Sequence, residues 1–294
     1  VGPVGDANPH FRWQALGDWD RAYRIRHSKL HPDNVHALGS PYSDWLLSTS
    51  SATRQLREAL REKRGAQRSV LLALTWHHGG ALRHWGDEEQ LLTALVQHIR
   101  ARGAFTLLRM HDRHRYHQDV IQRVERLAQR CGSALQLKWK DSSPDSLEDL
   151  LSSELCISNY SSILNHYYFT QRPSIHIDPH DVSAPFQRTY RMFLGRPWAR
   201  WVRSPEQIWK LPLEEHGGLR AHSFEQLLGH VDQALDHPEC CAERARSFVE
   251  RYVSQADGAS CARTTDFLRS WLGYGPAPQP RLRGEETQPQ QDGV

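Results

Sequence analysis

The sequence has no long apolar run, and its first residues lack the pattern of a secretory signal. A bilayer-spanning helix needs roughly 18–20 consecutive apolar residues, and a signal peptide needs a charged start before an apolar core. We therefore expect a chain that is soluble or at most peripheral to a membrane. Its expected place is the cytoplasm or the inner face of the cell membrane.

The cysteine spacing and the charge balance disfavour further classes of protein. Five cysteines without CxxC spacing predict neither a disulfide framework nor a zinc site. A formal charge of +3, from 37 basic and 34 acidic residues, gives no signature of nucleic-acid binding. His111, His114 and His117 lie three residues apart, but the outer two would face different sides of a helix. We expect no metal, no cofactor and no nucleic-acid partner.

From Val70 onward, short apolar runs alternate with amphipathic helical patterns. Continuous apolar runs of this length are typical of parallel strands that are covered on both faces. The apolar runs are SVLLAL, AFTLLRM, ALQLKW, LCI and PSIHI. Helices are expected over 51–63, before the first run, and then over 87–102, 117–130, 143–154, from about 160, 223–235, 238–253 and 258–271. This alternation predicts an α/β fold with a Rossmann-like parallel sheet.

Both ends of the chain depart from this pattern. Residues 1–38 are polar and irregular and do not form a complete domain by themselves. Residues 274–294 are rich in Pro, Gln, Glu and Gly, a composition typical of a disordered tail.

Ligands of parallel sheets bind beyond the carboxyl ends of the strands. Four segments expected to follow strands carry polar side chains, namely Thr75 to His78, Arg109 to His111, Ser158 to Ser162, and His216 to Gly218. The segment 158–162 has no glycine, yet it joins a strand to a helix expected to start near Tyr160. Its hydroxyls and the first free N–H groups of that helix would hold a phosphate. Alternatively, Ser158 or Asn159 caps the helix.

Two other segments also allow two interpretations. Arg109 and His111 end a strand, where they would hold a phosphate oxygen and assist a leaving phosphate, or simply face solvent. His77 and His78 form part of a loop with His84, where they act in catalysis or lie on the surface.

Six motifs in order resemble the CDP-glycerol glycerophosphotransferase family, the teichoic-acid and capsule polymerases. They are NVHALGSPYSD, VLLALTWHHGG, TLLRMHDRHRY, LCISNYSSILNHYYFTQRPSIHID, HGGLRAHSFEQLL and DGASCARTTDFL. They span about residues 34–271.

The resemblance implies a GT-B glycosyltransferase fold, of which this chain is mainly the C-terminal, donor-binding domain. It implies transfer of a polyol phosphate from a CDP-linked donor to a polymer or lipid-linked acceptor, with release of CMP and no metal. His111 matches the family's histidine at the donor phosphate, with Arg109 beside it. Donor-binding matches are Ser161, Ser162, Asn159, Gly217 and Gly218; Thr75, His77 and His216 are further candidates.

The sequence departs from the family's motifs at several positions. Asn159 stands where the family has aspartate, Tyr42 and His77 stand where it has arginine, and Asn165-His166 replaces its Phe-Asp. The family's base histidine, in a Trp-His-Gly motif before Gly39, has no counterpart here.

Three hypotheses and a domain plan follow. We expect a CDP-polyol transferase; a UDP- or CMP-sugar transferase of the GT-B type and a non-catalytic nucleotide-binding module are the alternatives. Residues 1–48 would be a remnant of, or linker from, an acceptor domain. Residues 49–273 would be the donor-binding domain and 274–294 the tail.

Overall fold

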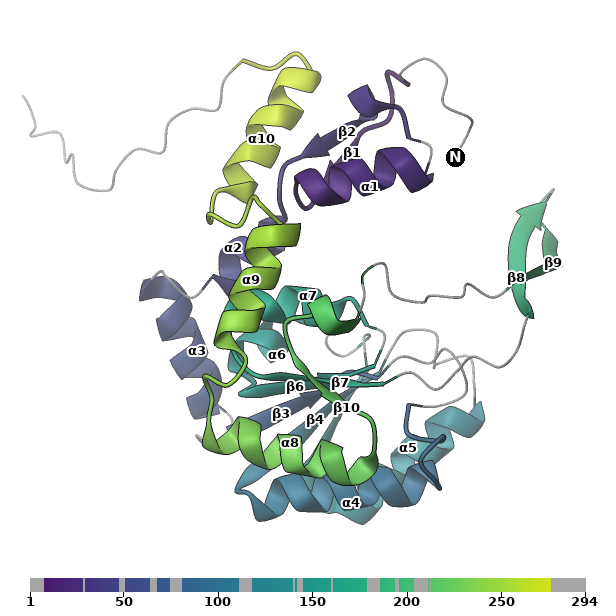
Figure 1. Ribbon diagram of the computed structural model, residues 1–294, viewed down its shortest axis with the longest axis vertical. Coiled ribbons are helices and arrows are strands. Elements are labelled where there is room, and N and C mark those ends of the chain that lie inside the picture. The colour runs from purple at the N-terminus through teal and green to yellow at the C-terminus, as the bar shows by residue number, and fades with distance from the viewer. Residues whose placement is uncertain are drawn as a thin grey trace, which may run out of the picture.

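The computed structural model describes residues 8–28, 30–47, 51–63, 68–74, 81–110, 118–139, 141, 145–159, 161–178, 186–193, 196–203, 211 and 213–275. Its centre is a six-stranded, wholly parallel sheet with the order β10-β7-β6-β3-β4-β5 (Figure 1). The strands are β3 (Arg68–Leu72), β4 (Ala104–Arg109), β5 (Leu135–Lys138), β6 (Leu155–Ser158), β7 (Ser174–Ile177) and β10 (Leu219–Ala221).

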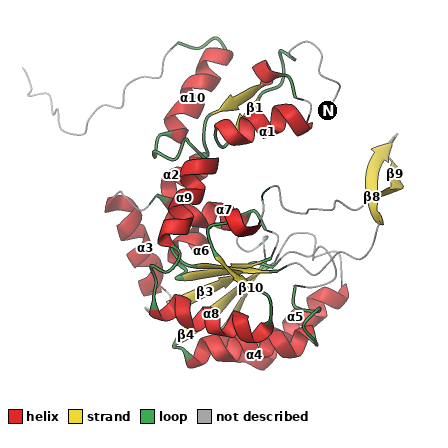
Figure 2. Cartoon of the chain, viewed as in Figure 1, coloured by secondary structure: helices red, strands yellow, loops and turns green. Residues whose placement is uncertain are grey.

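Helices cover both faces of this sheet (Figures 1 and 2). On one face lie α4 (Glu88–Ala101), α5 (Gln118–Cys131) and α8 (Phe224–Asp236). On the other lie α3 (Ser51–Lys63), α6 (Leu147–Ser152), α7 (Ile163–Tyr167) and α9 (Ala242–Tyr252). The parallel strands therefore read as continuous apolar runs, because neither face is open to water.

Each strand of the main sheet contributes side chains to two separate cores, because successive side chains point to opposite faces. In β4, Ala104 and Leu108 belong to the core under α4, whereas Phe105 and Leu107 belong to the core under α6 and α9. The same alternation places the next odd residue, Arg109, on the α6 face. Burial on both faces fixes this register, since a slip of one residue would exchange the two cores.

A smaller unit lies apart from the sheet (Figure 2). It contains β1 (Trp13–Ala15), α1 (Asp18–Ser28), the 3-10 turn Pro32–Asn34 and β2 (Val35–Ala37), with β1 and β2 paired in parallel. Among the described residues, the core of this unit holds the buried apolar residues Ala15, Leu30 and Val35. Helix α10 (Ser260–Trp271) packs beside it through ring contact between His36 and Phe267, 4.3 Å apart.

Two of the family-like motifs meet where α2 (Pro41–Leu46) contacts the start of α10. The carboxylate of Asp44 accepts hydrogen bonds from the backbone N–H groups of Ser260 (3.1 Å) and Cys261 (2.7 Å). Gly39 has a positive φ of 79°, and a Cβ there would lie 3.0 Å from the carbonyl oxygen of Gln255. The motifs NVHALGSPYSD and DGASCARTTDFL thus form a structural joint, in which a side chain caps a distant helix.

The alternation of strands and helices predicted from sequence is confirmed, but several boundaries are wrong. Helix α6 begins at Leu147 with Ser146 before it, and the expected start at Ser143 and Pro144 lies outside the described residues. Helices α9 and α10 start at Ala242 and Ser260, a few residues later than expected. Residues 1–38 are less irregular than expected, because they contain β1, α1 and β2.

Two strand features have no counterpart in the sequence-based prediction. β10 pairs with β7 at one edge of the main sheet, and the antiparallel strands β8 (Phe186–Phe193) and β9 (Arg196–Arg203) pair with each other (Figure 1). β10 has only three residues, which is too short for a clear apolar run. The expected disordered tail lies outside the described residues from 276 onward.

Candidate functional site

A charged cluster closes the carboxyl ends of β4 and β5. Arg109 and Lys138 are register partners on these strands, and both side chains reach the carboxylate of Asp149 on α6. Arg109 Nη1 lies 2.8 Å from Asp149 Oδ2, and Lys138 Nζ lies 2.5 Å from Asp149 Oδ1. Asp149 is fully buried, and the side chains of Arg109 and Lys138 are 11% and 12% exposed. Two cations are therefore fixed at the edge where we expect the site.

A hydrogen-bonded group centred on Tyr42 lies beside this charged cluster. The hydroxyl of Tyr42 donates to Asp145 Oδ1 (2.5 Å) and lies 2.9 Å from the hydroxyl of Ser146, just before α6. Burial, and then the bond to Asp145, raise the pKa of Tyr42 above its usual range. The ring of His166 meets the Tyr42 ring edge-on at 5.3 Å, and burial lowers the pKa of His166. Tyr42 thus joins α2 to α6 and α7.

The turn after β6 differs from the sequence-based expectation in the role of Ser158 and in the start of the helix. The Ser158 hydroxyl donates to the carbonyl of Ala73, the residue after β3, so this hydroxyl does not cap a helix. Helix α7 starts at Ile163, later than expected, and is five residues long. Its first N–H groups already have partners: Ile163 N bonds Ser161 Oγ (3.3 Å), and the next two amides bond the carbonyls of Ser161 and Ser162. The amides of Ile163, Leu164 and Asn165 are therefore already used within the turn.

Polar side chains also lie at this turn. Asn159 is buried at the end of β6, Ser161 is half-buried and Ser162 is exposed. Ser162 stands at the N-cap position of α7 without a side-chain capping bond. A hydroxyl in this position can donate to an anion without losing a structural bond.

Three predicted site residues lie outside the described residues. His111 follows Met110 at the end of β4, and Thr75 and His77 follow Leu74 after β3. The strand order places β3 between β4 and β6. The described ends of these three neighbouring strands therefore lie side by side at one edge of the sheet, as the sequence predicts for segments that follow parallel strands.

His216, Gly217 and Gly218 lie at the opposite edge, because they precede β10 instead of following a strand. Leu219, the first residue of β10, pairs with Ile175 near the start of β7. A Cβ on Gly218 would lie 2.7 Å from the carbonyl oxygen of Ser174, and one on Gly217 would lie 2.9 Å from Cα of Ala245. The glycines allow close backbone packing against β7 and α9, and the structure does not bring them together with Arg109 or Ser161.

His216 belongs instead to a buried cluster of rings with Tyr168, His176 and Phe248. The Tyr168 hydroxyl hydrogen-bonds His176 Nε2 and lies 3.5 Å from His216 Nδ1, and the two imidazoles are 4.9 Å apart. Burial lowers the pKa of His216 to about 4 and holds the pKa of His176 well below its usual value. Both histidines are therefore neutral near pH 7 and pack as part of the core.

The sequence analysis missed Lys138 and Asp149. Lys138 lies at the end of the apolar run ALQLKW, in register with Arg109, and a parallel pair of cationic strand ends is itself a signal that an anion lies nearby. Asp149 was hidden because it lies inside a short helix, where a carboxylate ordinarily faces solvent.

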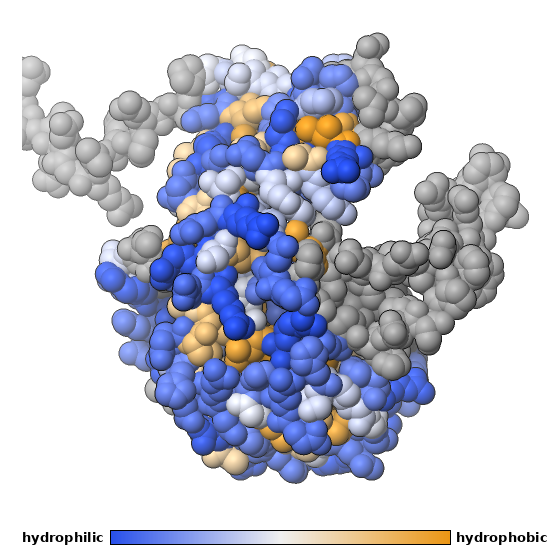
Figure 3. All heavy atoms as spheres, viewed as in Figure 1, coloured by the Kyte–Doolittle hydropathy of each residue, from blue (hydrophilic) through white to orange (hydrophobic). Residues whose placement is uncertain are grey.

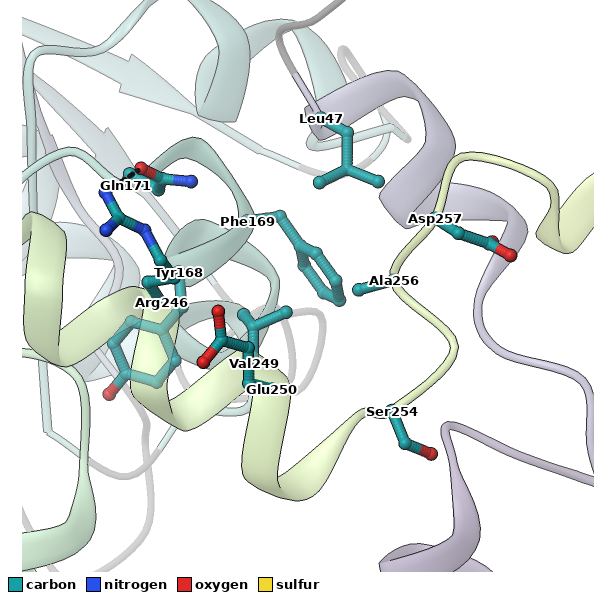
Figure 4. Close-up of a pocket in the computed structure, with 10 residues that line it drawn as sticks. All are labelled: Leu47, Tyr168, Phe169, Gln171, Arg246, Val249, Glu250, Ser254, Ala256 and Asp257. Carbon is teal, nitrogen blue, oxygen red and sulfur yellow. Dashed lines mark hydrogen bonds between the residues drawn. The ribbon is translucent and has the colours of Figure 1, made fainter.

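A cavity of about 480 Å³ lies away from this edge, beside α9 and the turn into β7 (Figure 4). Leu47, Phe169, Val249 and Ala256 give it an apolar wall, and Arg246 and Glu250 lie on α9. The cavity contains none of the candidate site residues.

Among the described residues, no helix is long and apolar enough to cross a membrane. Within the same part of the chain, no three His, Cys, Asp or Glu side chains gather as metal ligands would. The face seen in Figure 3 is mostly hydrophilic, with hydrophobic residues showing over the unit formed by β1, β2, α1 and α10.

A doubly covered parallel sheet with cationic and hydroxyl side chains after its strands is typical of the Rossmann-like domains of GT-B glycosyltransferases. The family model described as CDP-Glycerol:Poly(glycerophosphate) glycerophosphotransferase matches residues 18–183, more than half of the chain. The chain therefore belongs to this family of enzymes. The matched range includes Arg109, His111, Asn159, Ser161 and Ser162, and it ends before His216.

Solved structures of the wall teichoic acid polymerase TagF are similar in fold. A form soaked with CDPG matches with a TM-score of 0.62 and 14% identity, covering 89% of this chain and 58% of TagF. Another TagF structure matches with a TM-score of 0.59 at the same identity and coverage. The chain thus spans about 58% of the length of these relatives. No curated protein matches the sequence.

Proposed function

We propose that this chain is the donor-binding part of a transferase that moves glycerol phosphate, or a related polyol phosphate, from a CDP-activated donor to a surface-polymer acceptor. The observation that carries this proposal is the family match over residues 18–183. This range contains all the candidate residues that follow β3, β4 and β6. These three strands are neighbours, and their carboxyl ends lie at one edge of the sheet.

In the proposed site, the donor diphosphate lies along this edge. Arg109 neutralises phosphate charge, and the hydroxyls of Ser161 and Ser162 donate to its oxygens, with Asn159 beside them. His111 stabilises charge on the departing CMP by hydrogen bonding or proton donation. Phosphoryl-transfer catalysis consists mostly of such positioning and charge stabilisation. Thr75 and His77, which follow β3 in the sequence, are further candidates.

The remaining assignments rest on the resemblance. Residues 1–48 would belong to an acceptor domain, 49–273 would bind the donor and 274–294 would form a tail. The acceptor would be a polymer or a lipid-linked molecule. The enzyme would work in the cytoplasm, at the inner face of the cell membrane. It remains a prediction that Gly217, Gly218 and His216 contact the donor. Their position at the amino edge of the sheet does not favour such a contact.

A UDP- or CMP-sugar donor is the second candidate. Asn159 favours it, because a neutral amide stands at the end of β6 where the family carries a carboxylate. An amide tolerates other nucleotides and sugars, since it can both donate and accept hydrogen bonds.

The test compares His111→Ala with the wild type. We expect CMP release from CDP-glycerol, in the presence of acceptor and any missing half of the enzyme, to fall at least a hundredfold, because a positioned acid contributes about 10²–10⁴ in rate. His237→Ala is the matched control, since this histidine is exposed at the end of α8. Normal turnover in His111→Ala would contradict the assignment. Thermal shifts with CDP, UDP and GDP identify the nucleotide, and no shift with any of them favours a non-catalytic module.

A further inference from the structure

Helix α6 is too short to be stable alone, yet side chains from several elements hold its carboxyl end. A helix of six residues gains too few backbone bonds to offset its nucleation. Arg172, itself buried, donates to the carbonyls of Leu150 and Ser153. The hydroxyls of Tyr167 and Ser69 donate to the carbonyls of Ser153 (2.8 Å) and Ser152 (3.0 Å). The last carbonyls of α6, which would lack partners, are therefore fixed to β3 and α7.

The amino end of α6 is held as well. Asp145 accepts from the backbone N–H of Leu147 (2.9 Å) and from the hydroxyl of Tyr42 on α2 (2.5 Å). With both ends held, α6 has little freedom to move relative to the sheet. The side chain in its middle, Asp149, is therefore presented at a fixed point.

That fixed point lies between two cations. Arg109 and Lys138 are opposite one another on adjacent strands, an arrangement that repels without an anion nearby. Asp149 bonds one cation with each carboxylate oxygen, at 2.8 Å and 2.5 Å. Because Asp149 is fully buried, water does not compete with the two cations for its carboxylate.

We propose that Asp149 is a positioning residue, which fixes Arg109 and Lys138 at the carboxyl edge as a prearranged pair of cations for the donor diphosphate. This rests on the proposed function, because the diphosphate belongs to that donor. Asp149 itself does not touch the donor; it acts through Arg109. Arg109 lies two residues before His111, so the same anchor also fixes the strand end that leads to the proposed catalytic histidine.

The physical benefit is preorganisation. A free arginine side chain samples many rotamers and loses them when it binds an anion, which weakens the binding. A carboxylate that already holds the guanidinium removes most of that loss. Replacing it with the isosteric amide keeps the shape of the side chain and removes the charge that orders both cations.

The experiment measures dissociation constants for the full chain, by calorimetry with CDP-glycerol and inorganic pyrophosphate and by NMR with cytidine. For Asp149→Asn we expect the constants for CDP-glycerol and pyrophosphate to rise at least tenfold, while binding of cytidine, followed by NMR, stays unchanged. A general loss of structure would weaken all three ligands, so the split between phosphate-bearing and phosphate-free ligands reports positioning. Unchanged affinity for pyrophosphate in Asp149→Asn overturns the proposal.

The matched control is Asp232→Asn. Asp232 on α8 also lies between two basic groups, His98 (2.8 Å) and Arg102 (3.2 Å), but Arg102 precedes β4, at the other edge of the sheet. We expect less than a twofold change for all three ligands. An equal loss of pyrophosphate affinity in this control overturns the proposal, because the effect would then not be local.

Two further arms complete the test. If Asp149→Asn alone fails to fold, the double variant Asp149→Asn with Lys138→Met relieves the repulsion between the two cations. This double variant should bind pyrophosphate at least tenfold more weakly than Lys138→Met alone. Equal binding by the two variants overturns the proposal. A wild type that binds pyrophosphate but not CDP-glycerol contradicts the proposed function, while the pyrophosphate comparison still decides the role of Asp149. A wild type that binds neither overturns both.

Discussion

Two polar clusters lie on the same face of the same sheet, and they are built in opposite ways. At the ends of β4 and β5, Arg109, Lys138 and Asp149 are charged and paired. Beside β7, His176, His216 and Tyr168 are also buried, but burial keeps them neutral. The charged cluster lies where ligands of parallel sheets bind, whereas His216 enters the neutral cluster from the opposite edge. Buried polar residues therefore do not identify a site unless their edge and charge are known.

Low pH should destabilise the neutral cluster of His176, His216 and Tyr168 before the charged cluster. His216 has a folded-state pKa of about 4, below the unfolded value of 6.5, so the unfolded chain binds more protons between these values. Stability contributed by His216 is complete above pH 6.5 and is lost as the pH falls toward 4, by up to about 3 kcal/mol at about 1.4 kcal/mol per pH unit. His176, with its pKa also lowered, adds a loss of the same sign.

The measurement is urea unfolding between pH 7 and pH 4. His216→Gln should flatten the acid limb, because glutamine does not titrate, whereas His237→Gln at an exposed position should leave it unchanged. An acid limb as steep in His216→Gln as in the wild type would show that the cluster does not govern acid stability.

Close packing beside the neutral cluster should also contribute to stability. Gly218→Ala would place a methyl group 2.7 Å from the carbonyl oxygen of Ser174, so we expect a loss of about 2–3 kcal/mol in unfolding free energy. Gly229→Ala in α8 has nothing within 4 Å of its new Cβ and should gain about 0.5–1 kcal/mol from helix propensity. Thermal unfolding of both variants measures this contrast. A stable Gly218→Ala would contradict the packing role.

The charged cluster should tolerate the loss of one cation. Lys138→Met leaves Asp149 paired with Arg109, so we expect a loss of about 1 kcal/mol or less. Removing the carboxylate instead leaves two buried cations, for which a loss of about 3–5 kcal/mol is typical of a broken buried pair. Urea unfolding of Lys138→Met and Asp149→Asn compares the two. Equal losses would show that the carboxylate is no more important than either base.

The sheet could be predicted from the sequence because burial on both faces leaves continuous apolar runs such as SVLLAL and AFTLLRM. The placement of Arg109 and of the turn after β6 at one edge followed from the parallel arrangement. β10 could not be predicted, since three residues carry no periodicity. His216 to Gly218 were therefore expected after a strand, although they precede one.

The details of the site required the structure for a different reason. Hydrogen bonds inside the turn take up the first amides of α7, and no sequence pattern shows which donors are already used. Asp149 lies 40 residues from Arg109 and 11 from Lys138, so their meeting depends on how α6 packs on the sheet. Whether a family-like motif belongs to the site or to the scaffold is likewise seen only in three dimensions. Asp44 lies on α2, and its carboxylate accepts from the first backbone N–H groups of α10.

Hydrogen exchange with and without CDP-glycerol tests the central claim, that the donor binds at the carboxyl edge beside the charged cluster. We predict slower exchange for peptides that cover residues 105–110 and 155–163 when the donor is bound, and no change for residues 213–221. Protection of 213–221 with none at 105–110 or 155–163 would contradict the account and would return the donor to the glycine pair.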